Sequence, residues 1–295
     1  MTRRFFLAAL SAALSLAASA AAPTEIKVDL KLDASDFVVG ERIRGVIDVA
    51  NSSPDTVGVG GRFRVWGGEG TNRFLKAEYD VNDRLFVEVF RASSGTQLSR
   101  ISKGAFVADF AIETGEGQKL ETFLADHYAL RETSRYLAKP VFVHKGVRFE
   151  GQPRAFDVVD GVRAGSAMQM FATVPGLQRE FELVYWSKHL GEHLYLKARD
   201  VGNDGTRRWQ TRDLGSILRI DKPTISILPS GEVVVLHRIS QDQFVRSEYW
   251  SLPKEFIFRG QSLVNDPATA GTARVRELYR DKGVEPKRNP WWKFW

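Results

Sequence analysis

A five-residue segment in the second half of the sequence has the spacing of a metal site. Residues 189–193 read His-Leu-Gly-Glu-His, the inverted zinc-peptidase pattern in which two histidines bind zinc and the glutamate acts as base. That chemistry requires a helix to place both histidines on one face. The segment instead has glycine at its centre and joins two strand-like stretches, 181–186 and 194–196. We expect a hairpin with exposed His189 and His193 and no metal; a zinc peptidase is the alternative.

A second segment has part of a calcium-binding pattern. Residues 200–205 place carboxylates at the first and fifth positions and glycine at the sixth, but the third position is Gly202 and the twelfth is Thr211. The bidentate glutamate that a calcium loop needs is therefore missing, and we expect a polar turn.

Other catalytic equipment is sparse. The chain has no cysteine, which excludes zinc-thiolate sites and cysteine nucleophiles. It has no Gly-x-Ser-x-Gly nucleophile motif, no phosphate-binding loop and no dinucleotide-binding motif. None of its histidines has a candidate catalytic nucleophile next to it in the sequence. We expect no catalytic residue and no cofactor, and lean against an enzyme, although carboxylates far apart in sequence could still meet as a glycosidase pair.

The end of the sequence combines aromatic rings with positive charge. Residues from 274 onward carry a net charge of +4, and four of the last five residues are aromatic. Such a segment suits an anionic envelope surface, an envelope protein or a glycan. The predicted binding residues are Arg288, Trp291, Trp292, Lys293, Phe294 and Trp295. In the alternative interpretation this tail packs back into an apolar gap between domains.

The first 22 residues have the order of a signal peptide. Two arginines, Arg3 and Arg4, precede a largely apolar run at 5–18, and Ala-Ser-Ala at 18–20 offers a cleavage site. No other stretch approaches about 20 apolar residues, so we expect no transmembrane helix. The sequence therefore predicts a periplasmic or extracellular protein.

Length and charge set the broad class. A chain of 295 residues with 43% hydrophobic and 26% charged residues predicts globular structure in two domains. The net charge of +6 falls to +4 without Arg3 and Arg4, and the C-terminal tail accounts for that remainder. The body is then near neutral, and we expect no nucleic-acid partner.

The first half has the period-two alternation of β-strands with one buried face. We predict an antiparallel sandwich over 23–161, because turn-forming residues separate the strands regularly. The strands are expected at 26–32, 43–50, 62–66, 85–91, 105–112, 136–144 and 155–159.

Several segments of this half resemble the immunoglobulin-like modules of exported bacterial proteins. They are Phe-Val-Val-Gly-Glu at 37–41, Val-Ile-Asp-Val-Ala-Asn-Ser-Ser at 46–53, Gly-Gln at 117–118, Tyr-Ala-Leu at 128–130, Arg-Tyr-Leu-Ala at 135–138 and Phe-Asp-Val-Val at 156–159. The resemblance implies a sandwich of seven or eight strands. It also implies that the Tyr136 hydroxyl bonds to a nearby loop as a tyrosine corner, the alternative being a plain core aromatic.

The second half is also predicted to be antiparallel β, over 162–266. One hairpin turns at Pro229-Ser230-Gly231, and we expect the apolar run 233–236 to be the most buried strand. Tyr-Trp-Ser occurs at 185–187 and again at 249–251, which suggests two similar hairpins. A short basic helix and the aromatic tail are expected over 267–295.

The predicted function is therefore that of an exported, non-catalytic interaction or structural protein of the bacterial cell envelope. The alternative is a carbohydrate-active enzyme or glycan-binding protein that uses exposed tryptophans; candidates are Trp66, Trp186, Trp209 and Trp250. A cleft with two facing carboxylates would favour the enzyme. A protease inhibitor is a more distant possibility.

Overall fold

The computed structural model describes residues 26–67, 74–188, 191–201 and 207–265. This part of the chain is almost entirely antiparallel β-structure, as predicted, and its one helical element is the 3₁₀ turn η1 (Leu124–Asp126). The signal segment, the predicted C-terminal helix and the aromatic tail lie outside the described residues. No helix within the described part has the length and apolar character that a membrane crossing needs.

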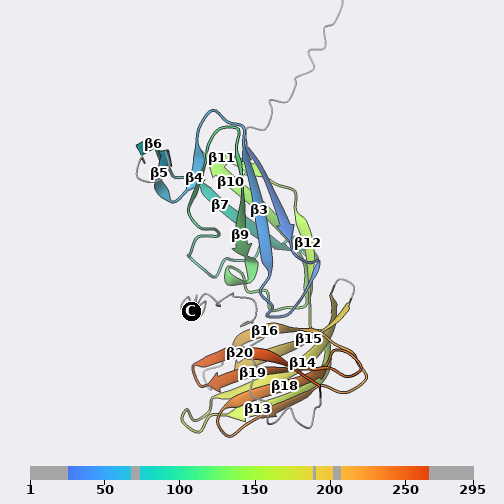
Figure 1. Cartoon of the computed structure of the whole chain (residues 1–295). Coiled ribbons are helices and arrows are strands. Elements are labelled where there is room, and N and C mark those ends of the chain that lie inside the picture. The colour runs from blue at the N-terminus through green and yellow to red at the C-terminus, as the bar shows by residue number, and fades with distance from the viewer. Residues whose placement is uncertain (1–25, 68–73, 189–190, 202–206, 266–295) are drawn as a thin grey trace, which may run out of the picture.

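Two main clusters of buried side chains define an N-terminal and a C-terminal β unit (Figure 1). The strands of the N-terminal unit are β1 (Ile26–Leu32), β2 (Asp36–Val38), β3 (Arg44–Asn51), β4 (Val57–Val59), β5 (Gly61–Gly67), β6 (Phe74–Val81), β7 (Arg84–Arg91), β8 (Phe110–Ile112), β9 (Gly117–Phe123), β10 (Ser134–His144), β11 (Val147–Glu150) and β12 (Arg154–Val159). Those of the C-terminal unit are β13 (Val162–Met170), β14 (Gln178–Lys188), β15 (Gly191–Val201), β16 (Arg207–Ser216), β17 (Thr224–Ile227), β18 (Glu232–Arg238), β19 (Phe244–Leu252) and β20 (Glu255–Val264).

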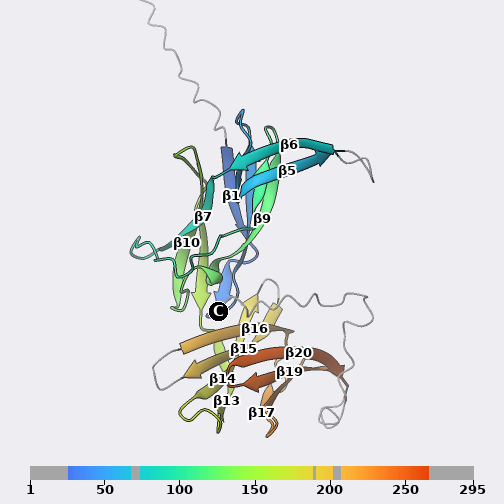
Figure 2. The same ribbon diagram turned by 90° about the vertical axis from the view of Figure 1, so that its left-hand side faces the viewer.

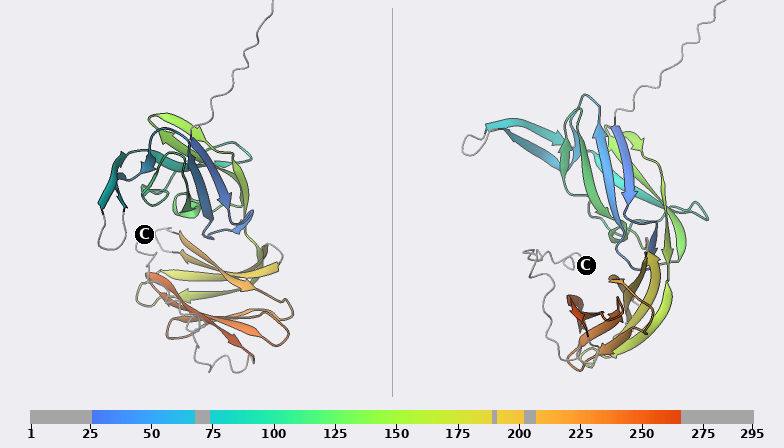
Figure 3. Two further views of the ribbon diagram at one scale, coloured as in Figure 1. Left: turned by 45° about the horizontal axis from the view of Figure 1, so that its top comes forward. Right: turned by 45° about the vertical axis from the view of Figure 1, so that its right-hand side comes forward.

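The N-terminal unit packs the sheet β1-β3-β9 against a sheet centred on β10. Strand β10 pairs with β7 along one edge and with β11 and β12 along the other, and β2 joins β12 in parallel. Alternate residues of each strand point into the shared apolar core, as period-two sequences require. The hairpin β5–β6 stands away from these two sheets (Figures 2 and 3).

The C-terminal unit consists of two four-stranded meanders, β13-β14-β15-β16 and β17-β18-β19-β20. Their inner faces meet around an apolar cluster that includes Leu183, Leu196, Val235 and Tyr249. The predicted turn at 229–231 is confirmed: Gly231 has φ of 84°, in the left-handed region that glycine tolerates, and its amide donates to the Leu228 carbonyl.

Three sequence predictions are wrong in detail. The strand expected at 105–112 is only β8, because its partner β4 offers just three residues; residues 106 and 107 reach the core from a loop instead. The hairpin expected to join 181–186 and 194–196 has a shorter loop than those bounds imply, since Lys188 already pairs with Gly191. The run 233–236 alternates between buried and half-buried residues, because only one face of its sheet meets the core.

Candidate binding cleft and the joint between the units

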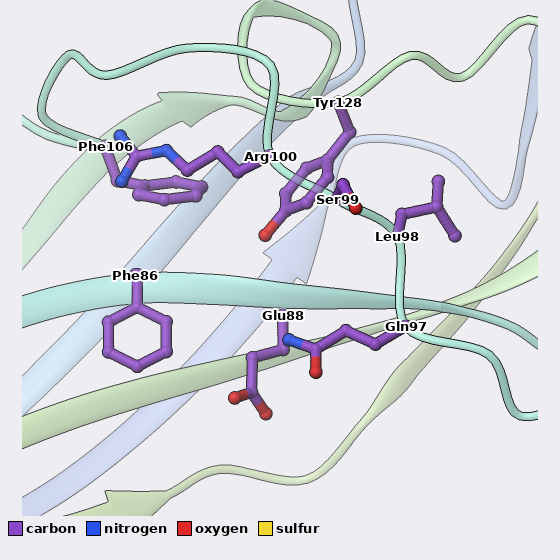
Figure 4. A pocket seen from close by; sticks show the side chains of 8 residues that line it. All are labelled: Phe86, Glu88, Gln97, Leu98, Ser99, Arg100, Phe106 and Tyr128. Carbon is purple, nitrogen blue, oxygen red and sulfur yellow. The ribbon is translucent and has the colours of Figure 1, made fainter.

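A cleft of about 450 Å³ lies beside β7 in the N-terminal unit. This volume falls within the range typical of small-ligand pockets. Its lining residues are Phe86, Glu88, Gln97, Leu98, Ser99, Arg100, Phe106 and Tyr128 (Figure 4).

The loop after β7 forms one wall of the cleft because it pairs with the edge of β7 over only a few residues. The Thr96 carbonyl accepts from the Arg91 amide at 2.9 Å, and the Leu98 amide donates to the Val89 carbonyl at 2.8 Å. The chain then departs from the strand at Ser99. The rest of this β7 edge is therefore left beside the cleft rather than under a neighbouring strand.

Tyr128 reaches across this gap and donates its hydroxyl to the Val87 carbonyl. Burial raises the pKa of Tyr128 to about 12, so the hydroxyl keeps its proton at neutral pH. The phenol therefore covers one carbonyl of the strand edge while its ring lines the cleft (Figure 4).

The aromatic wall opposite Phe86 is a stack of three groups. The Arg100 guanidinium lies 4.2 Å from the ring centre of Phe106, and the Phe106 ring stacks on His127 at 4.0 Å. Burial, followed by the positive charge of Arg100, lowers the pKa of His127 to about 4. At neutral pH His127 is therefore an uncharged support for the wall, and the cation of the stack is Arg100.

The carboxylate in the cleft is already paired. Glu88 is 3.2 Å from the ammonium of Lys139 and 3.1 Å from the guanidinium of Arg148. A glycosidase cleft needs two carboxylates facing a sugar, whereas Glu88 is the one carboxylate that lines this cleft. This cleft therefore does not have the facing pair of carboxylates on which the enzyme alternative depends.

A second, smaller hollow of about 300 Å³ lies on the outer face of β1-β3-β9. It is lined by charges of both signs, among them Lys31, Asp33, Asp48 and Lys119. A mixed, solvated sheet face of this kind has the ordinary character of a protein surface, and we assign no ligand to it.

The two units meet through the turn between β2 and β3. Residues 39 and 40 of this turn bond to Thr211 of β16, whose hydroxyl donates to the Val39 carbonyl at 2.6 Å. Val38 packs with Val184 and Tyr195 in a small apolar cluster. The joint is therefore made of both backbone hydrogen bonds and apolar contacts.

An ion pair is enclosed in the same joint. The Lys188 ammonium donates to the Glu41 carboxylate at 2.5 Å, and both side chains are largely buried. Burial raises the pKa of Glu41, an effect that the hydrogen bond from Lys188 opposes. Burial also raises the pKa of the neighbouring Tyr195, with the carboxylates of Glu41 and Asp213 adding to the effect. This cluster holds the two units together by charge as well as by packing.

The predicted chemical motifs have structural roles where they are described. The predicted hairpin is present, but His193 lies on its strand β15 and is half-buried rather than exposed, because its Nδ1 lies 2.9 Å from Asp213; His189 lies outside the described residues. No group of three potential metal ligands occurs within the described ranges. Asp200, from the calcium-like segment, instead pairs with the buried Arg179.

The predicted tyrosine corner has its hydrogen bond: the Tyr136 hydroxyl donates to the Glu132 carbonyl at 3.0 Å. The two copies of Tyr-Trp-Ser are also similar locally, since Tyr185 and Tyr249 both pack in the C-terminal core. The copies nevertheless occupy different places, the second strand of one meander and the third strand of the other.

The predicted tryptophan sites are not brought together. Trp186 packs against the apolar cluster of the joint, while Trp250 is 43% exposed on the other sheet with Arg259 5.0 Å from its ring centre. The side chains of Trp66 and Trp209, and all six predicted tail residues, lie outside the described part. The described tryptophans therefore form no shared platform for a glycan.

Sequence reasoning missed the cleft because four of its lining residues, 97–100, lie in a stretch without strand periodicity. One signal was available: Phe106 and Val107 are apolar neighbours within a polar loop, and both are buried. No feature of the sequence around Arg100 indicated that this residue lines a cleft.

No family model and no curated protein matches this chain. Among solved structures it is similar to Spo0M, the sporulation control protein of Bacillus subtilis, at 12% identity over 64% of this chain and 91% of that chain. The TM-score is 0.28, which supports no inference about fold or function.

Proposed function

We propose that this chain is an exported, non-catalytic interaction protein of the bacterial cell envelope, in the periplasm or outside the cell. The observation that carries the binding role is the cleft beside β7. It combines aromatic walls with a cation, Arg100, that forms no ion pair with any described residue. The carboxylate of the cleft is neutralised by its neighbours, so the cleft has the features of recognition rather than acid-base chemistry.

Export and envelope contact rest on the sequence. The charged, apolar and small-residue order of the first 22 residues supports export. The basic, aromatic tail supports attachment to an envelope protein or to an anionic envelope surface. Attraction to such a surface is worth about 1 kcal/mol per nearby basic residue and is screened within about 8 Å at physiological salt.

Cell fractionation followed by envelope capture tests this function. We expect the protein in the periplasm or medium without residues 1–20, as read by mass spectrometry of its N-terminus. The purified mature chain should sediment with isolated envelopes at low salt and be released as salt rises. Deletion of residues 289–295 should abolish sedimentation without changing the melting temperature.

A matched control replaces Trp291 and Trp292 with alanine and keeps every basic residue. Partial retention would show that charge and rings both contribute to attachment. A cytosolic protein that keeps its first 20 residues would contradict export. A large drop in melting temperature on tail deletion, with unchanged envelope association, would show that the tail instead packs on its own chain.

A further inference from the structure

The sheet β17-β18-β19-β20 of the C-terminal unit has an inner face that meets the core and an outer face that points away from it. Val235 and Tyr249 pack in the core and identify the inner face. Successive residues of a strand point to opposite faces, so Arg246 and Glu248 of β19 point outward. Ser262 of β20 lies opposite Arg246 in the ladder and therefore shares the outer face.

The two edge strands of this sheet differ in how far their outward residues are buried. On β17, Thr224 and Ser226 lie on the outer face and are exposed. On β20, Ser262 and Val264 lie on the same face but are only 6% and 5% exposed. A residue of an edge strand has a neighbouring strand on one side only, so burial this complete requires atoms that lie over the face. The outer face is therefore covered at β20 and open at β17.

The described contacts of this covered edge come from within the sheet itself. Val264 packs with Phe244 of β19 and Leu236 of β18. Arg246 lies 2.7 Å from Glu248, its neighbour along β19, and these two side chains are also under a tenth exposed. Within the described part of the chain, no strand from outside the sheet packs on this face. The cover must therefore be sought beyond the described residues.

The chemistry of the covered edge indicates what lies on it. Phe244, Leu236 and Val264 give it an apolar end. At its polar end, the Arg246 Nη1 and the Ser262 Oγ are buried without a hydrogen-bond partner among the described residues. Buried donors are almost always bonded in folded proteins. We therefore expect a covering segment that carries both apolar side chains and a hydrogen-bond acceptor.

The chain continues from this same edge. The described residues end at Asn265, directly after Val264, and residues 266–295 follow. The helical stretch expected at 272–281 has Val275, Leu278 and Tyr279 at spacings that place them on one helix face. Six residues, 266–271, join β20 to that stretch and reach about 20 Å when extended, whereas the neighbouring strand is about 4.8 Å away. The linker is therefore long enough to return over β19.

We propose that residues 272–281 dock as an amphipathic helix on the outer face of β19 and β20. Val275 and Leu278 contact the apolar end of the covered edge, and the Tyr279 hydroxyl accepts a hydrogen bond from Arg246. The basic and aromatic residues after Pro286 then extend from a fixed point on the C-terminal unit. The docking goes beyond the proposed function and does not depend on what residues 289–295 bind.

Thiol labelling of the full chain tests the proposal, because the chain has no cysteine of its own. Ser262→Cys places a thiol of nearly equal size under the helix. We expect it to react with iodoacetamide at least about tenfold more slowly than Ser226→Cys at the open edge of the same face, since reaction requires the helix to leave. Adding Leu278→Asp should bring the two rates to within about twofold, because a carboxylate in an apolar contact favours the undocked helix.

Val284→Asp is the matched control. It adds the same charge to the same segment, but Val284 lies beyond Gly283 and outside the expected helix. This variant should leave both labelling rates unchanged. Circular dichroism and the melting temperature would establish that each variant has a folded body.

Trypsin digestion of the unaltered chain is an independent measurement. A docked helix resists cleavage because a protease needs an extended, accessible substrate. Bonds after Arg274, Arg276 and Arg280 should therefore be cut more slowly than bonds after Lys287 and Arg288, as followed by mass spectrometry. The later sites are an internal control for the activity of the protease.

Equal labelling rates at the two edges of the full chain would overturn the proposal. So would a Ser262→Cys rate that Leu278→Asp leaves unchanged, since the cover would then be another segment. Cleavage within 272–281 as fast as at 287–288 would also contradict docking. Failure of envelope capture through residues 289–295 would change none of these rates, so the two proposals fail separately.

Discussion

The two β units differ in the kinds of side chain that they bury. The N-terminal unit encloses one large apolar cluster, and Glu88 is the one charged side chain among its described buried residues. The C-terminal unit has a smaller apolar cluster and buries charged groups as well, among them Arg179, Arg246 and Glu248. A small core gives less burial energy, and buried charges stabilise a fold only when they are fully paired. The comparison indicates that the C-terminal unit depends more on specific polar contacts.

Arg179 shows this dependence most clearly. Its side chain is 2% exposed and bonds to both oxygens of Asp200 on the neighbouring strand. It also bonds across the core to Ser251, Leu252 and Glu255 at 2.9 to 3.1 Å. One buried side chain therefore connects the two sheets of the C-terminal unit. In the N-terminal unit Arg154 connects the two sheets through Asp29 and the Leu30 carbonyl, but its side chain is 47% exposed.

The largest expected effect is that of Arg179→Met. The change leaves Asp200 and two carbonyls without their donor, so the C-terminal unit should lose about 3 to 5 kcal/mol of unfolding free energy. Urea unfolding with pulsed hydrogen exchange would measure each unit separately. Arg163→Met is the control, because its side chain is 65% exposed and 3.5 Å from Glu182, and should cost under about 1 kcal/mol. Equal losses in the two variants would refute the special role of Arg179.

The second prediction concerns stability at low pH, where the two units should lose similar amounts of unfolding free energy. Burial lowers the pKa of His237 in the C-terminal unit to about 4, and that of His127 in the N-terminal unit to about 4, from 6.5. As pH falls through this window, the unfolded chain takes up protons that the folded chain does not. Each unit should therefore lose up to about 3 kcal/mol of unfolding free energy between pH 6.5 and 4.

Two variants assign that loss. His237→Gln should flatten the pH dependence of the C-terminal unit alone, and His127→Gln that of the N-terminal unit alone. The measurement is again urea unfolding across the pH series, with the exchange pulse given at one fixed pH. Unchanged slopes in both variants would assign the acid sensitivity to other groups.

The smallest expected effect is the difference in stability between two tyrosine-to-phenylalanine variants, one in each unit. Tyr136→Phe removes the hydrogen bond to the Glu132 carbonyl and should cost the N-terminal unit about 1 kcal/mol. The Tyr249 hydroxyl is buried without a partner among the described residues, so Tyr249→Phe should cost the C-terminal unit nothing and could stabilise it. Thermal unfolding of both variants would measure the difference. A larger loss for Tyr249→Phe would mean that a bound water satisfies its hydroxyl.

Local pattern was sufficient for most strands. The alternation at 26–32 predicts a strand that the structure places residue for residue, because one buried face imposes a period of two. Proline and glycine at 229–231 predicted a hairpin for an equally local reason, since those residues restrict or permit the backbone angles of a tight turn. The absence of a helix at 191–193 also followed from its neighbours in sequence.

The sequence could not determine which strands are buried on both faces of their sheet. Residues 194–198 are all buried, although their strand was predicted only as one of several, whereas the apolar run 233–236 is buried on one face. The difference arises because the turn at 38–41 of the other unit covers the outer face of β15. The cleft has the same origin: Phe86, Arg100 and Tyr128 come from segments that only the folded chain brings together. Alternation is a local property of the chain, whereas burial on a second face and a binding cleft depend on contacts between distant segments.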